Sequence, residues 1–101
     1  MSYRYYEMKC IEWGQARKIV QNSTALAQLK KTREEVDELE EALLLGDKKA
    51  RDDAFGDIIV TLIMAATIED TDLVVCLEKA YNEIKDRKGW LDADGIFHKE
   101  G

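Results

Sequence analysis

The chain has 101 residues, and its acidic residues outnumber Lys and Arg by 21 to 15, which gives a net charge of −6. A chain of this length builds one domain with a modest core, so residues 1–101 are expected to form a single domain. The negative charge argues against a nucleic-acid partner held by a broad basic face. Proline is absent, and this favours long uninterrupted helices and an all-α class.

Cysteine spacing and hydropathy exclude further classes. Cys10 and Cys76 form no CxxC pair, which argues against a disulfide scaffold or a zinc site, and each is interpreted as a small buried hydrophobe. Residues 1–9 lack the apolar core of a signal peptide. The most apolar stretch, Ile58–Ile68, is shorter than the roughly 20 residues that a membrane span needs. A cytoplasmic protein without membrane contact is expected.

The spacing of apolar residues predicts a four-helix bundle. In the second helix, Leu29, Val36, Leu39 and Leu43 recur at helical intervals, and residues 22–24 offer a stop and an N-cap before it. We expect this bundle to oligomerise through its helices, as a homodimer or a dimer of dimers. The predicted helices span about residues 5–21, 25–45, 48–68 and 73–87.

Turn residues mark the ends of these helices. Gly46 is expected to end the second helix, and Asp47 to cap the third. After Gly56 the third helix is apolar on nearly all sides, which is typical of a central helix or of one that faces a second subunit, and we expect both roles. Gly56 itself indicates a close helix approach or space for a ligand. The tail, 90–101, contains Asp94-Gly95 and predicts a tight hairpin or an extended arm.

An acidic EExxE cluster occupies the middle of the second helix, from Glu34 to Glu38. Glu35 and Glu38 are three residues apart, so they lie on neighbouring parts of one helix face and can converge on one cation. For this pair, a metal site and a solvated surface both remain open. For Glu40 and Glu41 the solvated surface is the favoured interpretation.

A second acidic pair, Asp53 and Asp57, lies one helical turn apart in the third helix. Asp57 precedes an aliphatic run, and an ionised carboxylate within a packed face costs several kcal/mol unless a cation or hydrogen bond compensates it. The alternative is ordinary ion pairing. Its possible partners are Lys30, Lys31, Lys48 and Lys49.

Carboxylates from two successive antiparallel helices match the oxygen ligands that Mg²⁺ prefers, with Mn²⁺ as a possible substitute. The sequence has no EF-hand loop, which argues against Ca²⁺. Its one histidine, His98, lies in the tail, which argues against a di-iron site built from ExxH motifs. The candidate metal ligands are Glu34, Glu35, Glu38, Asp53 and Asp57.

The EExxE cluster, followed by Phe55-Gly56-Asp57 and an aliphatic run, resembles the MazG-like all-α nucleoside triphosphate pyrophosphatase family over most of the chain. Residues 80–89, AYNEIKDRKG, are similar to the small stand-alone members from bacteria and phages. The family's second motif is ExxD, but this chain has Ala54 in the glutamate position, and Asp53 is the nearest acid. The fourth ligand is therefore less defined than the others.

This resemblance implies hydrolysis of a dNTP or NTP between its α- and β-phosphates, which releases a nucleoside monophosphate and pyrophosphate. Mg²⁺ would neutralise the leaving group and lower the pKa of a bound water, while a carboxylate accepts the proton. Glu35, Glu38 and Asp57 are the catalytic candidates. The nucleotide-binding candidates, for which core packing or a plain polar helix face is the alternative, are Trp13, Lys31, Lys79, Asn82 and Lys85.

The competing hypothesis is a noncatalytic helical interaction protein. Its acidic stripe would be a solubilising surface, and its third helix would seal a dimer. Such a protein would release no pyrophosphate from any nucleotide.

Overall fold

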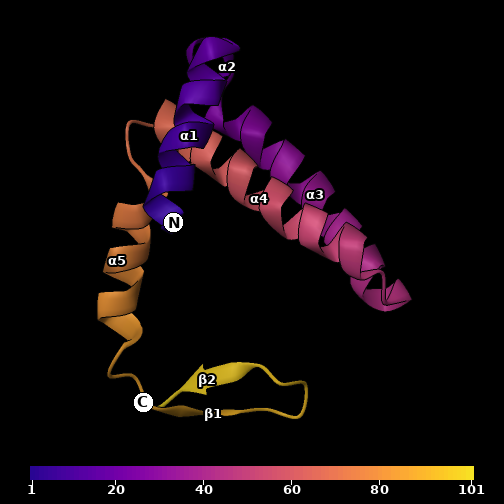
Figure 1. The fold of residues 1–101 in the computed structure, drawn as a ribbon. Helices are drawn as coiled ribbons and strands as arrows, with labels where there is room; N and C mark the ends of the chain where they lie inside the picture. Colours follow the sequence, from indigo (N-terminus) through magenta and orange to yellow (C-terminus); the bar gives the residue numbers. More distant parts are fainter.

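The computed structural model describes all 101 residues and contains five helices followed by a small hairpin (Figure 1). The two long helices, α3 and α4, lie side by side, α1 packs against α4, and α5 leads away from them to the hairpin. The all-α prediction is confirmed, whereas one chain alone does not close a four-helix bundle. The elements are α1 (Tyr3–Ala16), α2 (Ile19–Asn22), α3 (Ala25–Leu45), α4 (Lys48–Ile68), α5 (Leu73–Ile84), β1 (Gly89–Leu91) and β2 (Phe97–Lys99).

The boundaries of α3 and α4 agree with the prediction because their caps are chemically explicit. The Thr24 side chain accepts a hydrogen bond from the N–H of Ala27 at 3.1 Å, and Asp47 accepts one from the N–H of Ala50 at 3.0 Å. Gly46 has a φ of +68°, the left-handed conformation that glycine adopts readily at a helix end. The two helices therefore form a tight antiparallel pair.

The prediction of one helix over residues 5–21 was wrong. α1 ends at Ala16, and Lys18 adopts a left-handed φ of +65° before the short α2 begins. The break brings Val20 close to Gly14, where a Cβ atom would lie 3.4 Å from Cγ2 of Val20 and 2.3 Å from Sδ of Met64. Gly14 is thus the position where α1 approaches the core most closely. The last predicted helix also ends early, at Ile84.

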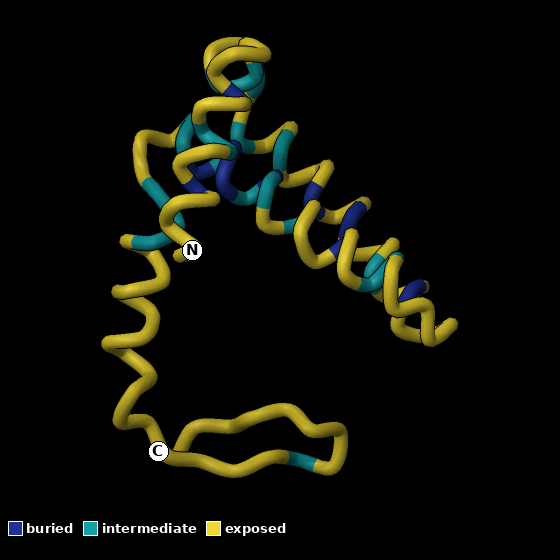
Figure 2. Tube along the Cα trace, in the orientation of Figure 1, coloured by how far each residue is buried: buried dark blue, intermediate teal, exposed yellow.

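The core is small and lies along α4. Only ten of the 101 residues are buried, and they lie along the α3–α4 pair and where α1 packs on α4 (Figure 2). The hydroxyl groups of Thr32 and Thr61 lie 2.7 Å apart and join α3 to α4 inside this core. The structure has no helix with the length and apolar character needed to cross a membrane.

The surroundings of Cys10, Cys76 and Gly56 differ from the sequence prediction. Both cysteines are free, as expected, but Cys10 is half-buried and Cys76 is exposed, so neither is a fully buried hydrophobe. A Cβ atom at Gly56 would meet no atom within 4 Å, so no close helix approach within the chain explains this glycine. Phe55 and Ile59 beside it are also exposed. One side of α4 therefore remains uncovered in a single chain.

A buried carboxylate attaches the start of α5 to α1. Glu7 accepts hydrogen bonds from the hydroxyl of Tyr3 at 3.1 Å and from the N–H of Val74 at 3.3 Å, and it also pairs with Arg4. Burial, together with the bond to Glu7, raises the pKa of Tyr3 to about 12. Arg4 also lies 3.3 Å from Asp72, the residue that caps α5. These contacts fix the direction in which α5 leaves the core.

Glu7→Gln should destabilise the fold, because it leaves Arg4 without its closest anionic partner and weakens the bond from Val74. The expected loss is about 1–3 kcal/mol of unfolding free energy, measured by urea denaturation. Glu12→Gln is the matched control on the exposed side of α1 and should change stability by less than about 0.5 kcal/mol. Equal midpoints for the two variants would show that Glu7 does not hold the junction.

The tail forms the tight hairpin that Asp94-Gly95 predicts. β1 and β2 pair antiparallel with Leu91 opposite Phe97, and Gly95 has a φ of +79° in the turn. Asp92 accepts hydrogen bonds from the N–H groups of Asp94 and Ile96, both at 2.9 Å, and lies 2.7 Å from the His98 ring. The contact with His98, followed by these backbone bonds, lowers the pKa of Asp92.

Candidate metal and nucleotide site

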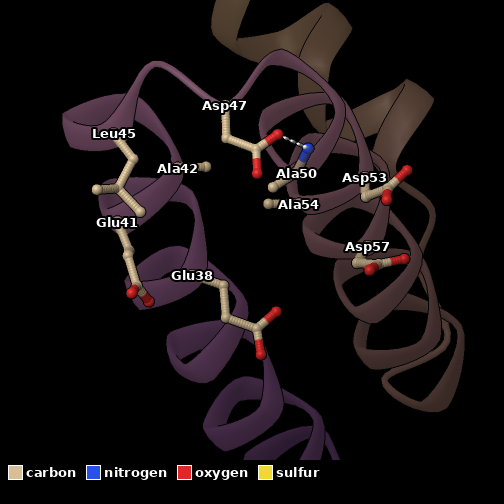
Figure 3. Close-up of a pocket in the computed structure, with 9 residues that line it drawn as sticks. All are labelled: Glu38, Glu41, Ala42, Leu45, Asp47, Ala50, Asp53, Ala54 and Asp57. Atoms are coloured by element: carbon tan, nitrogen blue, oxygen red, sulfur yellow. Dashed lines mark hydrogen bonds between the residues drawn. The ribbon is translucent and has the colours of Figure 1, made fainter.

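An acidic groove lies between α3 and α4, near the turn that connects them (Figure 3). Its volume is about 540 Å³. Small alanine side chains form its floor, and carboxylates stand around them on both helices. Five of the nine lining residues are acidic, so the groove favours cations. The lining residues are Glu38, Glu41, Ala42, Leu45, Asp47, Ala50, Asp53, Ala54 and Asp57.

Three of the predicted metal ligands line this groove. Glu38 projects from α3, while Asp53 and Asp57 lie one turn apart on α4 (Figure 3). The i to i+4 spacing keeps the two aspartates on one side of their helix, as the sequence indicated. The lining of the groove therefore includes residues from both acidic motifs.

Glu35 lies one turn before Glu38 and is buried between the helices. It is only 7% exposed, and its Oε2 atom has no hydrogen-bond partner. Its Oε1 atom lies 3.6 Å from Nζ of Lys31. Burial, followed by the nearby Glu38 carboxylate, raises the pKa of Glu35, while Lys31 acts in the opposite direction. A buried carboxylate with an unpaired oxygen, next to a second carboxylate, is suited to hold a divalent cation.

The two aspartates of α4 have different surroundings. Asp53 pairs with Nζ of Lys49 at 3.0 Å, so ion pairing, the alternative reading of the sequence, applies to it. The side chains of Lys49 and Asp53 are both largely exposed, which makes this ion pair weak. Asp57 has no ion pair but is exposed, so the expectation that it lies within a packed face was wrong. The buried carboxylate with an unpaired oxygen is Glu35 instead.

Glu34, Glu35 and Lys31 are not among the residues that line the acidic groove. Lys31 contacts Glu34 at 3.3 Å as well as Glu35 at 3.6 Å, and these contacts, chiefly the one with Glu34, raise the pKa of the lysine. Glu34 is exposed. It therefore acts in this structure as a surface partner of Lys31, whereas Lys31 keeps a positive charge next to the buried Glu35.

A second groove, of about 370 Å³, lies between α1 and α4 and shares Asp57 with the first. Trp13 lines it and is 42% exposed, so it is not packed in the core of the single chain. Sequence reasoning missed two neighbours, Tyr6 and Lys9, which line the same groove. Tyr6 lies three residues before Lys9 and seven before Trp13, so the three side chains share one face of α1. This spacing was the signal available in the sequence. This groove places an aromatic surface and a cation beside Asp57.

The three nucleotide-binding candidates on α5 are not part of either groove. Lys79, Asn82 and Lys85 are all exposed, and none of them lines the acidic groove. The Glu7 contacts fix α5 at the end of α4 that is remote from the Gly46 turn. Within one chain, these side chains and the carboxylates are therefore not brought together.

The carboxylates do not form a complete ligand set by themselves. The chain has no group of three or more His, Cys, Asp or Glu side chains close enough to hold a metal ion. Mg²⁺ is commonly held by one or two carboxylates together with substrate phosphates and water, instead of by a cage of protein ligands. Glu35 with Glu38 fits this manner of binding.

Neither a protein-family model, nor a curated protein, nor a solved structure matches this chain. The MazG-like resemblance therefore rests on the motifs alone, and the function follows from the residues of the groove as a proposal.

Proposed function

We propose that this chain is a Mg²⁺-dependent pyrophosphohydrolase that cleaves a nucleoside triphosphate between its α- and β-phosphates. The observation that carries the proposal is the buried Glu35 carboxylate, which has an unpaired oxygen and lies one helical turn before Glu38, a residue that lines the acidic groove together with Asp57. A purely structural role for the buried Glu35 would require hydrogen-bonding partners for both of its oxygens. A bound cation gives Glu35 the missing partner.

Glu35 and Glu38 from α3 would hold the cation, with Asp57 from α4 on the opposite side of the groove. The bound Mg²⁺ supplies charge neutralisation on the leaving pyrophosphate and a water molecule of lowered pKa. A carboxylate of this cluster accepts the proton of that water. Because the Glu38 carboxylate contributes to the raised pKa of Glu35, the two groups titrate together, and we assign this step to the pair and not to one residue.

The groove on the other side of Asp57 supports a position for the nucleoside. Trp13 and Tyr6 present partly exposed aromatic rings there, and aromatic rings stack on nucleobases. Lys9 lines the same groove and is suited to a phosphate oxygen. The substrate would thus span the two grooves with its triphosphate next to Asp57.

The charge of the acidic groove makes the cation obligatory in this proposal. A triphosphate would be repelled by five carboxylates unless Mg²⁺ stood between them. The direct experiment is to measure pyrophosphate release from a panel of dNTPs and NTPs with Mg²⁺, with Mn²⁺ and with a chelator. Release that needs the metal supports the proposal, and a chain that releases none with either metal would contradict it.

One observation favours the noncatalytic alternative, a helical interaction protein. Large apolar side chains such as Leu43, Leu44 and Leu77 are exposed, which is typical of a protein that binds a partner. An interaction protein, however, leaves the unpaired oxygen of Glu35 unexplained. The same nucleotide panel separates the two functions, because a binding module releases no pyrophosphate.

A further inference from the structure

The single chain exposes far more surface than a compact protein of its mass. Its accessible area is 7767 Å², whereas a folded monomer of 11.6 kDa exposes roughly 5,800 Å². Its radius of gyration is 15.9 Å, against about 13 Å for a compact domain of this length. The excess of about 1,900 Å² per chain is the amount that each side of an obligate dimer buries. The chain therefore has the surface of one half of an assembly.

Most of α5 lacks a partner for its apolar stripe. Leu77, Tyr81 and Ile84 recur at four- and three-residue spacing and are 64%, 59% and 50% exposed. Only the first half of the helix lies against its own chain, where Leu73, Cys76 and Leu77 line an apolar pocket with Tyr3 and Ile59. A helix of 12 residues with an uncovered stripe is not stable by its own propensity. Something must cover its last two turns.

A matching apolar strip runs along α3. Val36, Leu39, Leu43 and Leu44 line a shallow groove of about 430 Å³, and Val36 and Leu43 are exposed. At about 100° per residue, Leu43 points roughly opposite to Leu45, which lines the acidic groove. The strip thus lies on a different side of α3 from the proposed metal site and stays uncovered when that site is occupied.

Opposite charges favour the packing of α5 on α3 of a second copy. Glu40 lines the apolar strip itself, whereas the segment after α5, residues 85–88, reads KDRK and has three cations among four residues. Opposite charges beside two apolar stripes fix the orientation and favour this pairing over others. The stripes also match in length, since both span about two helical turns, or roughly 10 Å.

We propose that α5 of one copy packs its Leu77–Ile84 stripe on the Val36–Leu43 strip of α3 in a second copy, and that the exchange is reciprocal. Each four-helix bundle would then take α1, α3 and α4 from one chain and its fourth helix from the other. A reciprocal exchange satisfies two-fold symmetry, because the same two surfaces meet twice. This assembly is independent of the proposed nucleotide chemistry.

Cross-linking between differently tagged copies tests the exchange. In a background with Cys10→Ala and Cys76→Ser, one copy carries Tyr81→Cys and the other Leu43→Cys, and both are expressed together and mildly oxidised. We expect a disulfide-linked dimer that contains both tags. The matched control replaces Leu43→Cys with Leu45→Cys, the same substitution on the opposite side of α3, and should form at least tenfold less of that dimer.

Three outcomes would overturn the exchange. One is equal cross-linking of the Leu43→Cys and Leu45→Cys chains. Another is a chain with both Tyr81→Cys and Leu43→Cys that closes within itself and stays a monomer on a non-reducing gel. The third is sedimentation of the unmodified protein as a monomer at micromolar concentration. Ile84→Asp should convert the assembly to monomers, whereas Asn82→Asp, on the far side of α5, should leave it intact.

Discussion

Replacement of Glu38 by Gln should reduce Mg²⁺-dependent pyrophosphate release by at least about 100-fold, the typical contribution of a positioned acid or base. Glu38 lines the acidic groove and lies next to the buried Glu35, so it is the carboxylate best placed to join the cation to the substrate. Asp57→Asn should have a comparable effect, because Asp57 borders both grooves. The measurement is the rate of pyrophosphate release at saturating nucleotide.

The control for Glu38→Gln is Asp37→Asn, which neutralises the neighbouring exposed acid of α3 outside the acidic groove and outside the apolar strip. Its rate should stay within about twofold of the wild type, because surface acids of this kind are screened by solvent. Circular dichroism and sedimentation should show that all variants remain folded. Equal activity of the Glu38→Gln and Asp37→Asn proteins would show that the acidic groove takes no part in the reaction.

Replacement of Glu35 by Gln should stabilise the metal-free protein at neutral pH. Burial and the nearby Glu38 raise the pKa of Glu35, so the folded state favours its protonated form more strongly than the unfolded state does. The ionised side chain therefore costs stability as pH rises from the ordinary range of a glutamate through its folded pKa. Removal of the charge should recover about 1 kcal/mol, or an increase of about 4–8 °C in the melting temperature in a chelator.

Mg²⁺ should reverse this order of stability. The cation compensates the Glu35 charge in the wild type and has less to bind in the Glu35→Gln protein, so only the wild type should melt at a higher temperature when Mg²⁺ is added. Glu34→Gln is the control, because Glu34 is exposed and outside the groove. A Glu35→Gln protein that is less stable in the chelator would show that the carboxylate has a structural partner.

The helical pair α3 and α4 could be predicted from the sequence because local chemistry defines it. Thr24, Gly46 and Asp47 are a cap, a left-handed stop and a second cap, and each acts through its own backbone neighbours. The break after α1 could not be predicted, since Lys18 is not a residue that favours a positive φ. That conformation follows from the tertiary contact of Val20 with the region around Gly14 and Met64.

The candidate site could be predicted only in its composition. Helical spacing shows which acids share a face, and it correctly grouped Asp53 with Asp57. It does not show which face a neighbouring helix covers, because the rotation of α3 depends on the buried contact between Thr32 and Thr61. For that reason the sequence favoured Asp57 as the buried carboxylate, whereas the structure buries Glu35.

The most direct measurement is the binding of Mn²⁺, followed by the loss of the electron paramagnetic resonance signal of the free ion, with a triphosphate that cannot be cleaved between its α- and β-phosphates. The wild type should take up Mn²⁺ in the presence of this nucleotide, and the Glu35→Gln and Glu38→Gln proteins should take up at least tenfold less at the same free concentration. Uptake that is equal in all three proteins would show that the carboxylates between α3 and α4 do not hold the metal.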